Sequence, residues 1–318
     1  MITKASGRLK RYVGYTAFVS IAVCLSISLY VNLRLLPYRS TSHARWVDYT
    51  SAISGDHVSL QNRNGFVQTS RYSVFVREFG STTGSPTLVL LHGFQRSGTT
   101  FLPLVERLRN DYRLLVVDLP AHGNSFRSDI AATYTPDMND MVEAVQSLKE
   151  EYDLGRLNIV GHSLGGMVAV EFASQYPNSI NKLVMLESMV SRDQWQIEDS
   201  YDEYADDYYI ERGGSGVDMA SVIVNAFLHG VRTYEALGES IREWDRTATY
   251  TNSTTPILWL NYVNDNYDRI HFENRLDALA GGTHDYGLRP LITYYRAGHF
   301  FHWTVPDQVA AEIVRFVD

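Results

Sequence analysis

Short runs of apolar, often β-branched residues alternate along the chain with segments in which apolar residues recur every three or four positions. The runs predict seven strands, at Tyr72–Val76, Thr87–Leu91, Arg113–Val117, Leu157–Val160, Lys182–Leu186, Pro256–Leu260 and Ile292–Tyr295. The helical segments include Leu164–Tyr176 and Gln308–Val317. Strand–helix alternation requires crossover connections, so we expect an α/β fold: a mostly parallel sheet with helices on both faces.

One helix has a start signal of its own. Thr135 is a good N-cap residue, and Pro136 suits the first helical position. The apolar positions that follow recur at helical spacing, at Met138, Met141, Val142, Val145 and Leu148. We therefore expect this helix to begin just after Thr135.

The alternation stops between about residues 188 and 255. This stretch is strongly acidic and rich in aromatic residues, with Tyr201, Tyr204, Tyr208 and Tyr209 close together. An insertion of this length between two strands is more typical of a cap than of a bare loop. The tyrosine-rich part is either a solvated helix face or the entrance to a site that repels anionic substrates.

The N-terminal region has the pattern of a membrane anchor. Residues 12–33 carry no charged side chain and follow a basic tail, 1–11. Roughly 20 helical residues span a hydrocarbon core of about 30 Å, and no small-residue cleavage site is evident. We expect an uncleaved transmembrane helix at 12–33, a linker at 34–49 and a folded domain at 50–318. A cleaved signal peptide and a buried soluble helix are the alternatives.

The orientation of this anchor is less strongly encoded. Basic residues precede it, but arginines also follow it, at Arg34, Arg39 and Arg45. We expect the folded domain to lie outside the cytosol or in a lumen. The glycosylation sequon Asn252-Ser253-Thr254 fits that orientation.

Composition and charge exclude several classes of function. With 45% hydrophobic and 20% charged residues, the chain can bury a core, which excludes a disordered protein. Asp and Glu number 36 against 28 Lys and Arg, a net charge of -8, so nucleic acid is not an expected partner. The single cysteine excludes an internal disulfide and a thiolate metal cage.

The clearest chemical signal is a serine between a predicted strand and a predicted helix. The strand ends in Gly161-His162-Ser163-Leu164-Gly165, the G-x-S-x-G pattern in its strand–turn–helix setting. A nucleophilic serine needs a strained turn that lifts its hydroxyl above the sheet, and Gly161 and Gly165 lack the Cβ atoms that would collide there. Leu164 then begins the helix, so its N–H can point at a developing oxyanion. Ser163 is the predicted nucleophile.

In this setting the chain resembles the α/β-hydrolase family over roughly residues 50–318. The run Leu88-Val89-Leu90-Leu91-His92-Gly93-Phe94 resembles the family's strand that ends in His-Gly. The resemblance implies that Phe94 and Leu164 donate the two oxyanion N–H groups. For His92 we expect a loop-stabilising role rather than proton transfer.

The segment 118–125, Asp-Leu-Pro-Ala-His-Gly-Asn-Ser, resembles the family's D-x-x-G-x-G-x-S turn. It departs from that turn at Ala121, where glycine is usual. Because the turn is architectural in the family, the departure affects no expected catalytic group. His122 is accordingly not expected to act as a base.

A serine hydroxyl needs an adjacent base that a carboxylate orients, and in this fold the order is Ser, acid, His. The segment Ala297-Gly298-His299-Phe300 resembles the family's Gly-His ending and implies His299 as the base. His302 is the alternative, more typical of a pocket or surface residue.

The expected acid follows the strand that begins at Pro256. The run Pro256-Ile257-Leu258-Trp259-Leu260-Asn261-Tyr262-Val263-Asn264-Asp265 resembles the family's acid loop and implies Asp265. Tyr262 stands where glycine is usual, so Asp268 remains an alternative. Glu187, at the end of the preceding strand, is a further one.

The resemblance implies a membrane-anchored serine hydrolase that cleaves carboxylic esters through an acyl-enzyme, without metal or organic cofactor. Apolar residues near the expected site, Phe94, Phe300, Phe301 and Trp303, favour a hydrophobic substrate such as a lipid ester. Two other classes stay open. One is a cofactor-free dioxygenase or carbon–carbon-bond hydrolase of the same fold, and the other is a non-catalytic, hydrolase-like binding protein.

Overall fold

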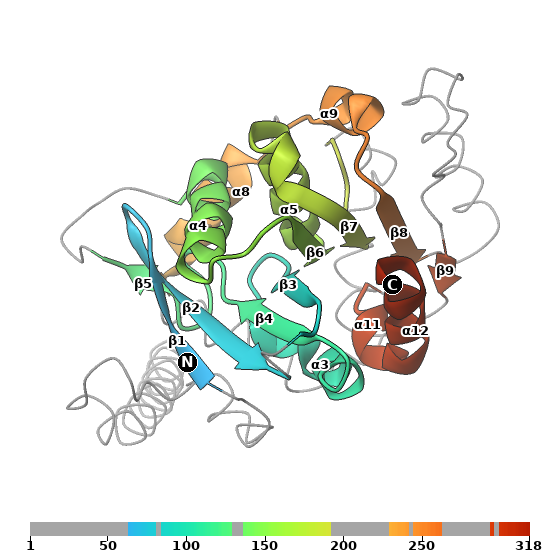
Figure 1. Ribbon diagram of the computed structural model, residues 1–318. Coiled ribbons are helices and arrows are strands. Elements are labelled where there is room, and N and C mark those ends of the chain that lie inside the picture. Colours follow the sequence, from blue (N-terminus) through green and yellow to red (C-terminus); the bar gives the residue numbers. More distant parts are fainter. Residues whose placement is uncertain are drawn as a thin grey trace, which may run out of the picture. The chain divides into compact units, whose positions relative to one another are not determined.

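A computed structural model gives the arrangement of the chain (Figure 1). It describes residues 63–80, 84–128, 136–191, 229–241, 244–262, 293–295 and 299–318. Asp265, Asp268 and the tyrosine-rich segment 201–209 lie outside these residues, as does the whole of 1–62. In the part that is described, no helix is long and apolar enough to cross a membrane. The anchor at 12–33 lies elsewhere in the chain and stays a prediction.

A mixed β-sheet runs through the described residues in the order β1-β2-β4-β3-β6-β7-β8-β9, with β5 paired to β2. Its strands are β1 (Arg63–Gln68), β2 (Tyr72–Phe79), β3 (Thr87–Leu91), β4 (Arg113–Val117), β5 (Phe126–Arg127), β6 (Leu157–His162), β7 (Ile180–Leu186), β8 (Ile257–Tyr262) and β9 (Thr293–Tyr295). From β4 to β9 all neighbours are parallel, whereas β2 is antiparallel to β1, β4 and β5. The expected α/β fold with a mostly parallel sheet is confirmed.

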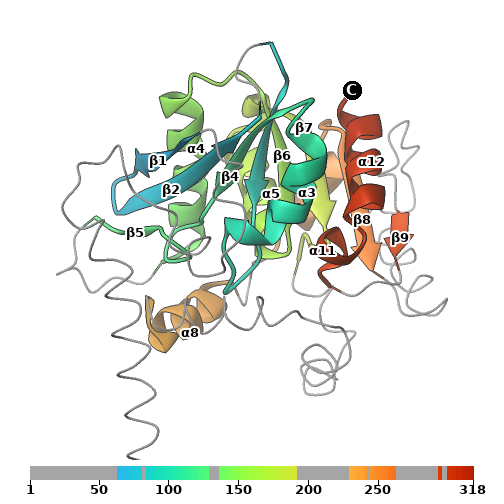
Figure 2. The same cartoon turned by 90° about the horizontal axis from the view of Figure 1, so that it is seen from below.

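Helices cover both faces of the sheet (Figures 1 and 2). The helices are η4 (Gly98–Phe101), α3 (Leu102–Leu108), α4 (Met138–Glu151), α5 (Leu164–Gln175), η5 (Pro177–Ser179), α8 (Val231–Ser240), α9 (Thr247–Asn252), α11 (Phe301–Thr304) and α12 (Pro306–Val317). α4 and α5 pack side by side on one face, and α3 and α12 pack together on the other.

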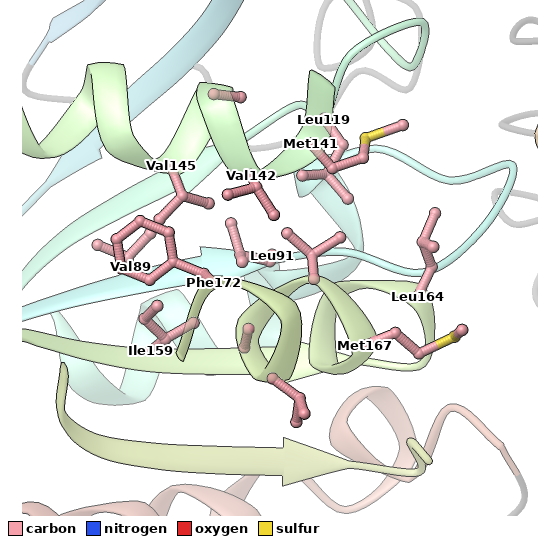
Figure 3. Close-up of a cluster of buried hydrophobic side chains, with 14 of the residues drawn as sticks. Val89, Leu91, Leu119, Met141, Val142, Val145, Ile159, Leu164, Met167 and Phe172 are labelled. Atoms are coloured by element: carbon pink, nitrogen blue, oxygen red, sulfur yellow. The ribbon is translucent and has the colours of Figure 1, made fainter. Parts of the chain in front are cut away.

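The strand β3 shows how the sheet divides the core. Its residues are buried from Leu88 to Leu91, and successive side chains of a strand point to opposite faces. Val89 and Leu91 pack in the cluster under α4 and α5 (Figure 3), whereas Leu88 and Leu90 pack with α3 and α12. A strand buried on both faces needs a continuous apolar run, which is why the sequence predicted it well.

The helix α4 begins two residues later than the sequence predicted. Its N-cap is Asp137, whose side chain accepts hydrogen bonds from the backbone N–H groups of Asn139 and Asp140. Asp140 accepts the N–H of Asp137 in return, so the two carboxylates form a capping box. The expectation that Thr135 caps this helix, with Pro136 at its first position, was therefore wrong. Asp is a stronger N-cap residue than Thr, so the helix begins after Asp137.

Parts of the insertion at about 188–255 lie within the described residues and are helical. Its last part forms α9, which packs against α5, and Tyr250 of α9 lies edge-on to Trp259 of β8 at 5.6 Å between ring centroids. Trp244 is buried and donates its indole N–H to Glu171 at 2.8 Å. The strand–helix alternation thus resumes before residue 255. α8 also falls within this stretch, and the expected cap stays a prediction.

Candidate active site

Ser163 occupies a strained corner between β6 and α5. Its φ is 51° and its ψ is -118°, a backbone conformation that non-glycine residues rarely adopt and that costs about 1–3 kcal/mol. Its N–H donates to the Leu186 carbonyl at 3.0 Å, and its carbonyl accepts the Ser188 hydroxyl at 2.7 Å. These bonds hold Ser163 against the end of β7 while its side chain stays half-buried.

Close packing around this corner leaves no room for side chains at the neighbouring glycines. A Cβ added at Gly165 would lie 1.9 Å from the carbonyl oxygen of Leu91, at the end of β3. A Cβ at Gly161 would lie 2.5 Å from the backbone of Gly165. The glycines therefore let the first turn of α5 approach both its own strand and β3.

The two expected oxyanion donors lie in segments next to Ser163. Leu164 is the first residue of α5, and the N–H groups of Gly166 and Met167 donate to the Ser163 carbonyl. A Cβ added at Gly93 would lie 3.2 Å from the Cβ of Ser163, so the segment that carries Phe94 passes directly beside the serine. A helix N-terminus and a loop from β3 thus meet at one side chain.

His92 fixes the start of this loop. It is fully buried, and its Nε2 accepts the N–H of Leu119 at 3.0 Å. Nδ1 therefore carries the proton, which it donates to the Gly93 carbonyl at 2.7 Å. Burial lowers the pKa of His92 to about 4, so the ring is neutral near pH 7. It stabilises the loop, as the sequence predicted.

A buried ion pair that the sequence analysis missed supports the same loop. Arg77 of β2 and Asp118, which follows β4, are fully buried and form two bonds of 2.7 and 3.0 Å. The Asp118 carboxylate also accepts the N–H groups of Gly98 and Asn124. Burial opposes its ionisation most strongly, but the charge and hydrogen bonds of Arg77, the nearby His92 and the N–H of Asn124 together outweigh burial and lower the pKa of Asp118. A charged Arg-Glu pair near the end of a mostly apolar strand was the available signal.

The helix α8 and a residue shortly before it are hydrogen-bonded to the turn at 118–125. Ala121, where the family usually has glycine, has a φ of 58°, and its carbonyl accepts the Tyr234 hydroxyl at 3.0 Å. His229 donates from Nε2 to the Gly123 carbonyl, also at 3.0 Å. The ring of Tyr234 lies edge-on to Phe94 at 5.7 Å. These contacts hold α8 (Figure 2) next to the segment that carries Phe94.

His122 is enclosed in this contact rather than presented for catalysis. It is fully buried, with Nδ1 2.9 Å from the Pro120 carbonyl and its ring 5.2 Å from that of Tyr234. Burial holds its pKa well below the usual value. A neutral, packed imidazole fits the architectural reading of this turn.

The segment with His299 reaches the same corner from the far end of the chain. The His299 carbonyl lies 3.0 Å from Nε2 of His162, and the two rings are 4.7 Å apart. His162 directly precedes Ser163, so the expected base and nucleophile lie in neighbouring segments. His302 is fully buried against Phe101, and burial lowers its pKa to about 3. It is a core residue, neither the pocket nor the surface residue that the sequence suggested.

For the expected acid, the structure describes only the strand that precedes it, β8. β8 is parallel to β7, so its C-terminal end at Tyr262 lies at the same edge of the sheet as Ser163. Asp265 and Asp268 follow that end, outside the described residues. Glu187 follows β7 with a φ of 43° and donates its N–H to the Leu260 carbonyl.

Metal ligation finds no support among the described side chains. No group of three or more His, Cys, Asp and Glu residues there is arranged to hold a metal ion. The buried histidines contact carbonyls, aromatic rings and one another instead.

Comparison with known proteins agrees with this arrangement. A serine hydrolase-like protein of Danio rerio is 36% identical over 115 residues, which are 35% of this chain and 33% of the relative. A pimeloyl-[acyl-carrier protein] methyl ester esterase of Aeromonas hydrophila is 33% identical over 126 residues, 39% of this chain and 46% of that protein. A hydrolase from Pseudomonas aeruginosa PA01 has a similar crystal structure, with a TM-score of 0.61 and 22% identity over 80% of this chain and 98% of that one.

These relatives define a shared core rather than a shared activity. The chain spans about a third of the length of the first curated relatives that it matches. A family model described as the alpha/beta hydrolase fold matches residues 86–273, more than half of the chain. With its strand order and its strained serine between β6 and α5, this chain belongs to the alpha/beta hydrolase fold family.

Proposed function

We propose that this protein is a serine hydrolase that cleaves carboxylic esters through an acyl-enzyme. The backbone of Ser163 is the observation that carries the proposal. A φ of 51° at a half-buried serine is costly, and such strain persists where the surrounding structure enforces it, often at active sites. The esterases and hydrolases among the similar proteins support the reaction class.

In the proposed first step, the Ser163 hydroxyl attacks the ester carbonyl while His299 takes its proton. The carbonyl oxygen becomes an oxyanion, which the N–H groups of Phe94 and Leu164 stabilise by a few kcal/mol each. His299 then gives the proton to the departing alcohol, and the acyl group stays on Ser163. Water repeats the sequence and releases the acid.

A carboxylate has to stabilise the imidazolium that forms on His299. We assign this role to Asp265, which follows the end of β8, and keep Asp268 and Glu187 as alternatives. β7 and β8 are parallel, so Glu187 and the C-terminal end of β8, which Asp265 and Asp268 follow in the sequence, lie at the same edge of the sheet. Single Asn or Gln substitutions separate them, because only loss of the true acid lowers kcat by orders of magnitude.

The proposed substrate is a hydrophobic ester. Phe94, Phe300 and Trp303 are half-buried near the ends of their strands and helices, so they can contact an apolar acyl group. Phe301, expected with them, is fully buried in the core beside α12 and does not contribute. A chain-length series of nitrophenyl esters tests this proposal.

We further propose that residues 12–33 anchor the protein in a membrane, with the hydrolase domain lumenal or extracytoplasmic. Tethering would raise the local concentration of lipid esters around the site. Extraction of membranes at alkaline pH, with and without residues 1–33, tests the anchor. Protease protection of sealed vesicles tests the orientation.

Labelling by a fluorophosphonate tests the mechanism. Wild type should label, whereas Ser163→Ala and His299→Ala should not. Equal labelling of all three would refute the proposal. Oxygen uptake without labelling of Ser163 would favour the cofactor-free dioxygenase, and folded protein with neither activity would favour a binding protein.

A further inference from the structure

His162, between Gly161 and Ser163, is fully buried at the end of β6. Its Nε2 lies 3.0 Å from the backbone carbonyl of His299. A carbonyl oxygen only accepts, so Nε2 carries the ring proton and donates it. His162, the residue before the expected nucleophile, thus donates a hydrogen bond to the backbone of the expected base, His299.

The imidazole of His162 also lies against the segment that carries Phe94, one of the two expected oxyanion donors. A Cβ added at Gly93 would lie 2.9 Å from Nδ1 of His162, so the imidazole lies against the backbone that leads to Phe94. Nδ1 has no hydrogen-bond partner among the described residues. The donor at Nε2 is therefore the polar contact through which this side chain acts.

Aromatic rings enclose His162 on the side of the base. The rings of His299, Phe300 and His302 lie 4.7, 5.0 and 4.4 Å from it, centroid to centroid. The guanidinium of Arg96 lies over Phe300. A ring held on several sides has little freedom, so its hydrogen bond to the His299 carbonyl is fixed in direction.

His162 also stays neutral when His299 takes the proton of Ser163. Burial holds its pKa well below the usual value, and nearby positive charge on His302, His299 or Arg96 lowers the pKa further. His162 therefore does not compete with His299 for the proton of Ser163. Its hydrogen bond to the base is made with the backbone carbonyl, not with the imidazole.

We propose that His162 is a positioning residue: its Nε2–H holds the carbonyl of His299 and thereby sets where the base imidazole stands relative to Ser163. Without that donor the backbone at His299 is free to shift. A displacement of about 1 Å in a catalytic group can cost on the order of 100-fold in rate. The inference rests on the proposed hydrolase.

A matched pair of substitutions tests this role. His162→Gln keeps an N–H donor at similar reach, whereas His162→Met has similar length and no donor. We expect His162→Gln to keep kcat within about threefold of wild type, and His162→Met to lose about 10- to 100-fold in kcat with little change in KM. Equal kcat in the two variants, whether both high or both low, would overturn the proposal.

Two controls keep the result interpretable. Fluorophosphonate labelling of wild type and of Ser163→Ala tests the proposed hydrolase by itself. If His162→Met does not fold, ¹⁵N-histidine NMR of wild type replaces it, with the signal assigned by its loss in His162→Gln. We expect a ring that is neutral, carries its proton on Nε2 and does not titrate at the ordinary histidine pKa of 6.5, because burial lowers its pKa. An Nδ1–H tautomer would overturn the inference without reference to activity.

Discussion

Replacing Asp118 by Asn removes the negative member of a buried ion pair while keeping the side chain's volume. Arg77 and Asp118 are fully buried, and both guanidinium nitrogens Nη1 and Nη2 reach the carboxylate. The substitution removes the negative charge that faces the Arg77 guanidinium in the core. Breaking one partner of a buried pair costs about 3–5 kcal/mol of unfolding free energy.

The structure places Asp118→Asn toward the upper part of that range. The carboxylate accepts two further backbone N–H groups, from Gly98 at 2.7 Å and Asn124 at 2.8 Å. One amide oxygen cannot serve the four donors that two carboxylate oxygens serve. Asp307→Asn is the matched control, because Asp307 pairs with Arg107 at 2.8 Å but its side chain is 80% exposed. Exposed pairs contribute about 0–1 kcal/mol.

Urea unfolding of wild type and both variants measures the difference. We expect Asp118→Asn to lower the denaturation midpoint strongly with an unchanged slope, and Asp307→Asn to leave it nearly unchanged. A cost below about 1 kcal/mol for Asp118→Asn, or one equal to that of the control, would refute the reasoning.

Acid unfolding adds a second readout for the same residue. Burial opposes ionisation of Asp118, but Arg77 together with His92 and the N–H of Asn124 outweighs burial, so the folded-state pKa lies below the ordinary value of 3.8. The stabilisation is complete above that ordinary value and is lost as the pH falls through the lower folded value. Asp118→Asn should lack this contribution to the acid transition.

Three further changes test other parts of the structure. Gly165→Ala places a Cβ 1.9 Å from the Leu91 carbonyl, so we expect loss of fluorophosphonate labelling and a lower thermal midpoint. Tyr234→Phe removes a bond to the Ala121 carbonyl and should cost about 1 kcal/mol in urea unfolding. His302 stays neutral down to about pH 3 in the fold but protonates near pH 6.5 when unfolded, so stability falls as the pH drops below 6.5. His302→Phe should reduce that slope by about 1.4 kcal/mol per pH unit.

The sequence predicted the central strands well because burial on both faces leaves an unbroken apolar run. β3 and β4 have the expected bounds, Thr87–Leu91 and Arg113–Val117. β1 was missed, because Arg63–Gln68 lies at the edge of the sheet and has mixed polarity. The run at Tyr72–Val76 was recognised but continues to Phe79, past the charged Arg77 and Glu78.

Local patterns also located the strained corner at Ser163, since strand, glycine spacing and helix are adjacent in the sequence. The residue pairs that hold the segments around that corner are far apart in the sequence. Arg77 meets Asp118 across 41 positions, Tyr234 meets Ala121 across 113, and His162 meets His299 across 137. Periodicity and spacing describe neighbours along the chain, so no pattern in the sequence pairs such residues.

Four strands of the sheet lead into corners where a non-glycine residue has a left-handed backbone: Gln95 after β3, Ala121 after β4, Ser163 after β6 and Glu187 after β7. At each corner the chain changes direction within a few residues of the C-terminal end of its strand. These residues therefore set the geometry of that edge of the sheet before the loops begin. Loop libraries built to change selectivity should therefore spare these corners. Diversity introduced beyond them, for example along α8, would leave these four corners around the proposed site unchanged.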